Sequence, residues 1–243
     1  MAYVPPSIDG QRQPAPLSCE ELVVRAHALE GISIGELAHA IGATIPAGRS
    51  STKGFIGQLL EKALGADPEA LDLPDFPALG VELKSIPVAN AFILKPIEST
   101  FLASISMAYA DRAEWETSRL RHKLASVLWV PVEGKWKGEL ADRLIRSPRL
   151  WRPTAAEFEA LEADWMELMG AIGAGNAAQL TGRDGKYIQV RPKAANSKVR
   201  VAAPNEHSVD MQHPLGFYMR ASATRGILQE GSMLAFEGDE ESK

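Results

Sequence analysis

Residues 74–88 read PDFPALGVELKSIPV and bring together Asp75, Glu82 and Lys84. The alternation from Val81 to Val88 predicts a strand, and side chains two apart on a strand share a face, so Glu82 and Lys84 should lie side by side. Turn-forming residues between Asp75 and the strand allow the chain to fold back and place the second carboxylate next to Glu82. Two carboxylates about 4 Å apart repel by roughly 4 kcal/mol in a protein-like dielectric, so such a pair predicts a cation between them.

The residue types indicate which cation and which reaction. Hard oxygen ligands without a nearby His or Cys favour Mg²⁺ or Mn²⁺. Lys84 beside that ion could orient an attacking water or stabilise charge on a phosphate, which is typical of metal-assisted phosphodiester hydrolysis. The alternative is an ordinary strand face, because opposite charges are common on exposed strands and the spacing alone does not separate the two interpretations.

Composition limits the class of protein. The 243 residues are 45% hydrophobic and 23% charged, which suits one large globular domain or two small lobes. The single cysteine, Cys19, excludes an internal disulfide and a multi-cysteine zinc site. The N-terminal residues lack the apolar core of a signal peptide, and no run of about 18 apolar residues occurs, so we expect a cytoplasmic protein without membrane contact.

Charge is unevenly distributed although the net charge of −5 gives no indication of a nucleic-acid partner. Segment 153–169 is acidic, whereas segment 183–200 carries six basic residues against Asp184: Arg183, Lys186, Arg191, Lys193, Lys198 and Arg200. This asymmetry predicts one surface offered to phosphates and another turned away.

The N-terminal part is predicted to be helical after a disordered tail over residues 1–17. Ser18 and Ser33 are expected to cap two short helices that imitate a helix-turn-helix, but the second lacks side chains suited to reading bases, so packing is favoured. Ser51 or Thr52 should cap a third helix. Lys53 and Gly54 at its entrance could meet a phosphate through a charge and free backbone amides, or form only a helix entrance.

The remaining chain alternates strands and helices. Strands are expected at 92–94, 100–106 and 126–132. Helices are expected at 115–124 and, opened by Pro153, Thr154 and Glu157, up to about Gly173. Residues 179–193 are predicted to form a hairpin with its tight turn at Asp184 and Gly185. In the strand 214–220, Tyr218 should face away from its apolar neighbours, and residues 233–243 read as an acidic tail after one domain over 18–232.

Arg191, Pro192 and Lys193 lie at the end of the predicted hairpin, in a basic loop. An arginine can bond the O6 and N7 edge of guanine in bidentate fashion, which discriminates against other bases by about 1 to 3 kcal/mol. The alternative is that these charges contact only phosphates.

Five blocks of the sequence resemble the MutH family of DNA mismatch repair endonucleases, in the order and approximate spacing of that family. They are DFPALGVELKSIPV at 75–88, WETSRLRHKLASVLWVPVEG at 115–134, SPRLWRP at 147–153, RPKAANSK at 191–198 and LGFYMR at 215–220. The resemblance runs from about Glu21 to about Ile227. It implies an α/β restriction-endonuclease-like fold with a mixed β-sheet and two arms around a DNA-binding cleft, in an enzyme that nicks the unmethylated strand at hemimethylated GATC.

The resemblance also assigns catalytic residues. Asp75, Glu82 and Lys84 match the Asp and Glu-x-Lys signature of the group, and Mg²⁺ would be held by Asp75, Glu82 and the backbone carbonyl of Leu83. Glu61 corresponds to an acid at the edge of the active centre. Lys123 corresponds to a second active-site lysine.

Further positions are matched to DNA contacts and partners. Phe101 would contact bases, Arg191 would read the guanine of GATC, and Tyr218 would lie near the adenine whose N6-methyl group is sensed. A single nick follows if one active centre engages one strand, which points to a monomer, and the resemblance implies activation by MutL after MutS has bound a mismatch. The match fades beyond Thr224, where the C-terminal segment differs from the family.

Two other functions stay open at this point. A stand-alone GATC restriction endonuclease could share this catalytic domain but would need dimerisation or a second copy, which 243 residues argue against. A DNA-binding module without catalysis is disfavoured by the intact Asp75, Glu82 and Lys84 set.

Overall fold

A mixed three-stranded sheet lies at the centre of the molecule, in a computed structural model that describes residues 13–46, 54–70, 72–89, 92–134, 139–193, 201–204 and 209–236. Its strands are β1 (Glu82–Val88), β3 (Val127–Glu133) and β4 (Arg149–Trp151), in the order β1-β3-β4. β1 and β3 run parallel, and β4 is antiparallel to β3. Parallel neighbours need a long crossover, which here runs through residues 89–126.

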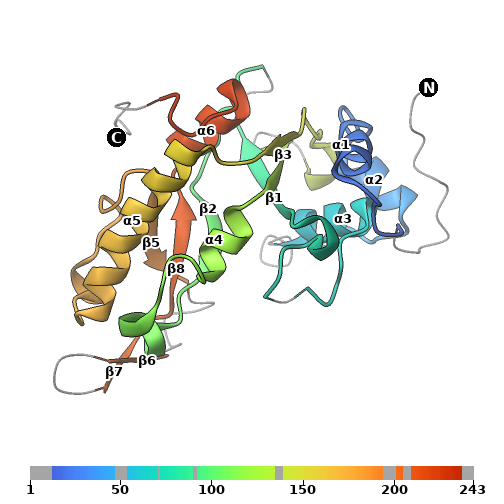
Figure 1. The fold of residues 1–243 in the computed structure, drawn as a ribbon. Coiled ribbons are helices and arrows are strands. Elements are labelled where there is room, and N and C mark those ends of the chain that lie inside the picture. Colours follow the sequence, from blue (N-terminus) through green and yellow to red (C-terminus); the bar gives the residue numbers. More distant parts are fainter. Residues whose placement is uncertain are drawn as a thin grey trace.

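The two faces of this sheet pack against different parts of the chain (Figure 1). On one face, apolar residues of β1 and β3 contact α1 (Cys19–His27), α2 (Ile34–Ala40) and α3 (Phe55–Leu64). On the other face, Ile86, Val127 and Trp129 join a second apolar cluster. A sheet buried on both faces explains why SVLWVPV reads as a continuous apolar run.

The second cluster belongs to a lobe built on an antiparallel sheet. Its strands are β2 (Thr100–Ser104), β8 (Leu215–Met219) and β5 (Ile188–Pro192), with β8 in the middle. The helices around it are α4 (Arg119–Leu124), α5 (Ala155–Gly173) and α6 (Ala221–Glu230), and a two-stranded ribbon is formed by β6 (Val201–Pro204) and β7 (Val209–Gln212). The predicted α/β class with a mixed sheet flanked by helices is confirmed.

Local signals in the sequence placed several helix starts correctly. Ser18, Ser33 and Thr154 cap α1, α2 and α5 by accepting hydrogen bonds from backbone amides three residues later. The predicted cap of α3 is wrong, because Gly54 occupies the N-cap position and supplies no side-chain bond. α1 and α2 pack into the apolar cluster beside the central sheet, as favoured over a DNA-reading role.

Two predicted strand features are wrong. Residues 92–94 form an exposed turn in which Phe92 is 96% exposed. The expected hairpin at 179–193 does not form, because β5 pairs with β8 and residues 182–187 are turns and bends. Asp184 nevertheless makes a tight turn by accepting bonds from the backbone amide and hydroxyl of Thr181.

Two acids of segment 153–169 are buried rather than turned to solvent. Asp164 accepts hydrogen bonds from three consecutive backbone amides, those of Lys186, Tyr187 and Ile188, at 2.8, 2.6 and 2.8 Å. Glu157 is 1% exposed and accepts bonds from Trp151, Thr154, Ser232 and Met233. These buried carboxylates are hydrogen-bonded and anchor the entrance of β5 and the segment after α6.

The ends of the described chain pack more closely than the sequence indicated. In the expected N-terminal tail, the carbonyl of Pro14 accepts a 2.7 Å bond from Arg25, and Gln13 is buried. In the expected acidic tail, Met233 is buried in the second apolar cluster. None of the helices within the described ranges is long and apolar enough to cross a membrane.

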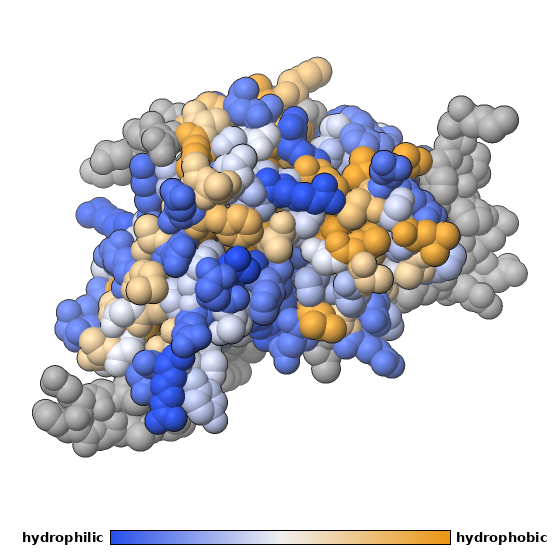
Figure 2. Space-filling view, viewed as in Figure 1, coloured by the Kyte–Doolittle hydropathy of each residue, from blue (hydrophilic) through white to orange (hydrophobic). Residues whose placement is uncertain are grey.

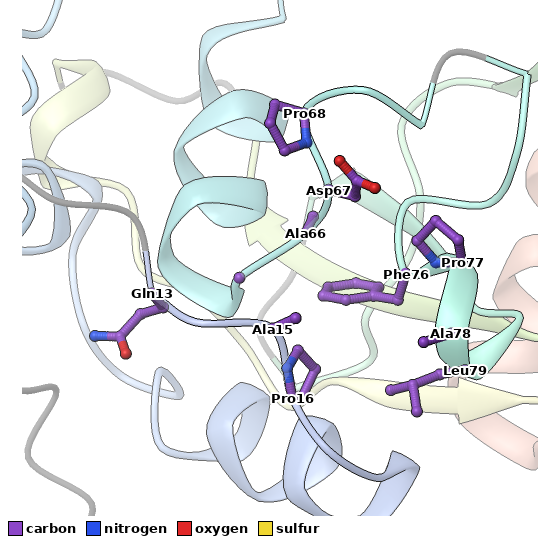
Figure 3. Close-up of a pocket in the computed structure, with 11 residues that line it drawn as sticks. Gln13, Ala15, Pro16, Ala66, Asp67, Pro68, Phe76, Pro77, Ala78 and Leu79 are labelled. Carbon is purple, nitrogen blue, oxygen red and sulfur yellow. The ribbon is translucent and has the colours of Figure 1, made fainter.

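On the face shown in Figure 2, exposed apolar residues form separate groups, and larger ones lie over the α1–α3 side of the molecule. A pocket of about 410 Å³ also lies on that side, between residues 13–16, the end of α3 and the turn at 76–79. Figure 3 shows Phe76 projecting between these segments. The residues that line the pocket are mainly apolar, so the pocket offers few groups for chemistry.

Candidate active site and nucleic-acid face

The turn between Asp75 and Glu82 has the predicted form. Residues Pro77–Leu79 make one 3-10 turn, Gly80 adopts a left-handed φ of +63°, and Phe76 forms a bridge with Val81. The chain thereby folds back, and Asp75 Oδ2 accepts a 2.7 Å hydrogen bond from the amide of Leu83. The carboxylate of Asp75 is therefore held at the first residues of β1, next to Glu82.

Glu82 is enclosed by two lysines. Only 2% of Glu82 is exposed. Lys84 Nζ donates to Glu82 Oε1 at 2.6 Å, which confirms that these side chains share a strand face. Lys123 Nζ lies 2.9 and 2.8 Å from the two carboxylate oxygens. A buried carboxylate requires such paired and hydrogen-bonded charge, so this cluster is a specific arrangement rather than an ordinary solvated strand face.

Lys123 reaches Glu82 because of the strand register. The parallel pairing of β1 and β3 aligns Glu82 with Val127, so the end of α4, just before β3, lies level with the start of β1. Ser118 begins α4 by accepting a 3.1 Å bond from the amide of Arg121. The helix then directs Lys123, which is 8% exposed, toward Glu82.

Electrostatics at the two carboxylates favour a cation. Burial, and then repulsion by Glu82, raise the pKa of Asp75, although the amide of Leu83 and the two lysines partly oppose this shift. A divalent cation would relieve both costs. The described residues contain no group of three or more His, Cys, Asp or Glu side chains placed for metal binding. Asp75, Glu82 and the Leu83 carbonyl offer oxygen donors of the kind that Mg²⁺ prefers, and Mg²⁺ commonly keeps several waters and takes only one or two carboxylates.

Two further predicted residues lie on or beside α3. Glu61 lies on the side of α3 that faces β1, since a Cβ built on Gly57 would lie 3.9 Å from both Glu61 Oε1 and the hydroxyl of Ser85. Gly54 adopts φ +87° at the N-terminus of α3 and has open space around its Cα. Lys53 lies outside the described residues, so its predicted phosphate contact is not placed.

Phe101 and Tyr218 face one another on the antiparallel sheet. The two residues are register partners on β2 and β8, and their rings make an edge contact with centroids 5.4 Å apart. Tyr218 is half-buried whereas Phe217 and Met219 are buried, as the strand alternation predicted. A Cβ on Gly216 would lie 2.8 Å from Phe101 Cε2, so a glycine there allows this ring to pack closely against β8.

Lys193 connects this face with the carboxylate cluster. Its Nζ lies 3.7 Å from the centroid of the Phe101 ring and donates a 3.0 Å bond to Ser104 Oγ. Burial, followed by the positive charges of Arg119, Lys84 and Lys123, lowers the pKa of Lys193. The predicted recognition residue and the predicted catalytic lysines thus contribute to a single positive region, which suits a phosphate backbone.

Arg191 and Pro192 complete β5 at the same edge, and both are exposed. Arg191 Nη2 donates a 3.1 Å bond to Gln189 Oε1. Sequence reasoning missed Gln189, Ser104 and Arg119 as members of this region. The alternation of a strand could have indicated Gln189, because it stands two residues before Arg191.

Comparison with known proteins gives a consistent assignment. The family model described as "DNA mismatch repair enzyme MutH" matches residues 64–164, which include Asp75, Glu82, Lys84 and Lys123. The DNA mismatch repair protein MutH of Vibrio cholerae is 42% identical over 218 residues, covering 89% of this chain and 98% of that protein. The proteins of the same name from Serratia proteamaculans and Escherichia coli are 44% and 42% identical, over 88% and 89% of this chain and 94% and 96% of their own lengths. The chain therefore belongs to the MutH family of DNA mismatch repair proteins.

Proposed function

We propose that this protein is a Mg²⁺-dependent endonuclease of mismatch repair that nicks the unmethylated strand 5′ to the guanine of hemimethylated GATC. One observation carries the proposal. Glu82 is buried between Lys84 and Lys123 while a second carboxylate, Asp75, is held beside it. One lysine would be enough to neutralise Glu82 if the pair served stability alone. Two carboxylates can in addition bind a metal ion, and two lysines can orient a water and contact a phosphate.

The chain's own residues account for positioning and charge. Asp75, Glu82 and the carbonyl of Leu83 would hold Mg²⁺, which when bound supplies Lewis acidity at the scissile phosphate. Lys84 keeps further N–H groups beyond its bond to Glu82, so it can orient the oxygen of an attacking water. Lys123 can stabilise the negative charge that develops on the phosphate. Attack of water on phosphorus breaks the bond to the 3′ oxygen, which takes a proton, and leaves a 5′-phosphate.

DNA recognition is assigned to the face of the β2-β8-β5 sheet that carries Phe101, Tyr218 and Arg191. Arg191 would read guanine, and Tyr218 with Phe101 would lie along the adenine and exclude an added N6-methyl group by lack of space. Lys193 would contact a phosphate between this face and the carboxylate cluster. Geometry supports this assignment, because the Phe101 ring contacts both the Tyr218 ring and the ammonium group of Lys193.

Membership of the family supports the proposal that the protein acts as a monomer and is activated by MutL, which responds to mismatch-bound MutS. One catalytic set acting on one strand produces a nick, which is what strand-directed repair requires. A stand-alone restriction endonuclease would instead cut both strands.

The test uses supercoiled plasmids carrying one GATC in unmethylated, hemimethylated or fully methylated form, with Mg²⁺ and with or without MutL and ATP. We expect nicking confined to unmethylated strands, faster with MutL and absent on full methylation. Glu82→Gln and Lys84→Ala should abolish nicking while DNA binding persists. Linearisation without MutL would favour the restriction enzyme, and intact binding without cleavage under any condition would leave a DNA-binding module.

A further inference from the structure

Gln189 is a fully buried polar side chain that the catalytic scheme does not use. It lies in β5 and has 0% exposure. Its neighbours Ile188 and Val190 point into the apolar cluster. Gln189 therefore projects to the opposite face of the sheet, the face that carries Arg191 two residues later. A buried amide is costly unless both of its ends are hydrogen-bonded.

Both ends of the Gln189 amide have partners. Nε2 donates a 2.7 Å bond to Ser99 Oγ, and Oε1 accepts a 3.1 Å bond from Arg191 Nη2. A guanidinium can only donate, so Arg191 determines which end of the amide is the oxygen. A Cβ on Gly182 would lie 3.3 Å from Oε1, so the turn before β5 covers this oxygen closely. The amide cannot rotate without losing both bonds.

The position of Gln189 in the sheet places these two hydrogen bonds on the face that is assigned to DNA recognition. Gln189 is the register partner of Tyr218 on β8, which is in turn the partner of Phe101 on β2. The bonds from Ser99 through Gln189 to Arg191 therefore cross the strand that carries Tyr218. They connect the start of β2 with the end of β5.

We propose that Gln189 is a positioning residue that holds the guanidinium of Arg191 in the orientation for reading guanine. This inference rests on the proposed function. One N–H of Arg191 is tied to the amide, and its other N–H groups are left to face a base edge. A long, exposed arginine fixed in this way loses less conformational freedom on binding, so its contact discriminates between bases more strongly.

The test compares Gln189→Leu with Gln189→Glu on hemimethylated duplexes that contain GATC or AATC. The leucine variant loses the oxygen that accepts from Arg191. We expect the ratio of kcat/KM on GATC to kcat/KM on AATC to fall about tenfold in this variant, because part of the discrimination given by one bidentate arginine–guanine pair is lost. The glutamate variant keeps an oxygen for Arg191 and can accept from the Ser99 hydroxyl, so its ratio should stay within about threefold of wild type.

Two controls separate positioning from stability and from the function itself. Val190→Ala removes core methyl groups on the other face, so it should lower the Tm and leave the ratio unchanged. NMR of the Arg191 side chain should show hindered rotation of the guanidinium in wild type and in Gln189→Glu, and averaging in Gln189→Leu. An unchanged ratio in Gln189→Leu, or free rotation in wild type, overturns the proposal. A wild-type enzyme that cuts GATC and AATC equally overturns the recognition scheme instead, and the NMR result then decides the positioning role alone.

Discussion

Replacing Lys123 by Met tests the electrostatic design of the carboxylate cluster. Lys123 Nζ contacts both oxygens of Glu82, which is 2% exposed, so the substitution leaves a buried carboxylate with one remaining cation, Lys84. Breaking a buried ion pair by removing one partner costs about 3 to 5 kcal/mol. Because Lys84 stays in place, we expect a loss of about 3 kcal/mol, which corresponds to a Tm lowered by about 6 to 12 °C in a chain of this size.

The assay is thermal unfolding in EDTA and in Mg²⁺ or Ca²⁺. If Asp75 and Glu82 hold a cation, that ion supplies the positive charge that Lys123→Met lacks, so the metal should raise the Tm of the variant by more than it raises that of wild type. Nicking should nevertheless stay at least about a hundredfold slower, because charge on the phosphate is no longer stabilised. Lys95→Met removes an exposed lysine and serves as the matched control. Equal Tm losses in the two variants, or an equal response to metal in Lys123→Met and wild type, would refute this reasoning.

Three further predictions address other parts of the fold and site. Asp164→Asn offers one oxygen and an opposing N–H₂ to three amide donors, so urea unfolding should show a loss of about 2 to 4 kcal/mol, and an unchanged midpoint would contradict the anchoring role. In Asp75 the folded pKa is raised, so ionisation costs stability above the unfolded pKa. Asp75→Asn should therefore raise the Tm in EDTA at neutral pH, have little effect at a pH low enough to protonate the wild-type carboxyl in both states, and abolish stabilisation by Mn²⁺. The lowered pKa of Lys193 means that its charge is lost at a lower pH than that of an ordinary lysine. Wild-type DNA affinity, measured by fluorescence anisotropy from about pH 7 to about pH 10, should decline with rising pH more steeply than that of Lys193→Arg, and parallel curves would exclude Lys193 from the contact.

Local chemistry made much of the central motif predictable. The turn from Asp75 to Glu82 could be predicted because proline restricts φ and glycine permits a positive φ. Gly80 indeed adopts a positive φ. The pairing of Glu82 with Lys84 follows from the two-residue period of a strand. Capping residues likewise located the starts of α1, α2 and α5.

Partner strands were not predictable in the same way. Asp184 and Gly185 form a turn, but that turn leads into β5, whose partner is β8 some 25 residues later. The buried acids Glu157 and Asp164 look like their solvated neighbours in the sequence. Only their contacts with segments far along the chain, residues 232–233 and 186–188, distinguish them.

The sequence by itself determined the residue types of the site, the Asp75 turn, the shared face of Glu82 and Lys84 and, through resemblance, the family. The turn and the shared strand face depend on backbone preferences and periods that act within about ten residues. The tertiary structure alone decided that Lys123 meets both oxygens of Glu82, that Lys193 lies over Phe101, and that Gln189 bonds to Ser99. Each of these contacts depends on strand register and on burial across the core, which are cooperative properties of the folded chain and carry no local signal.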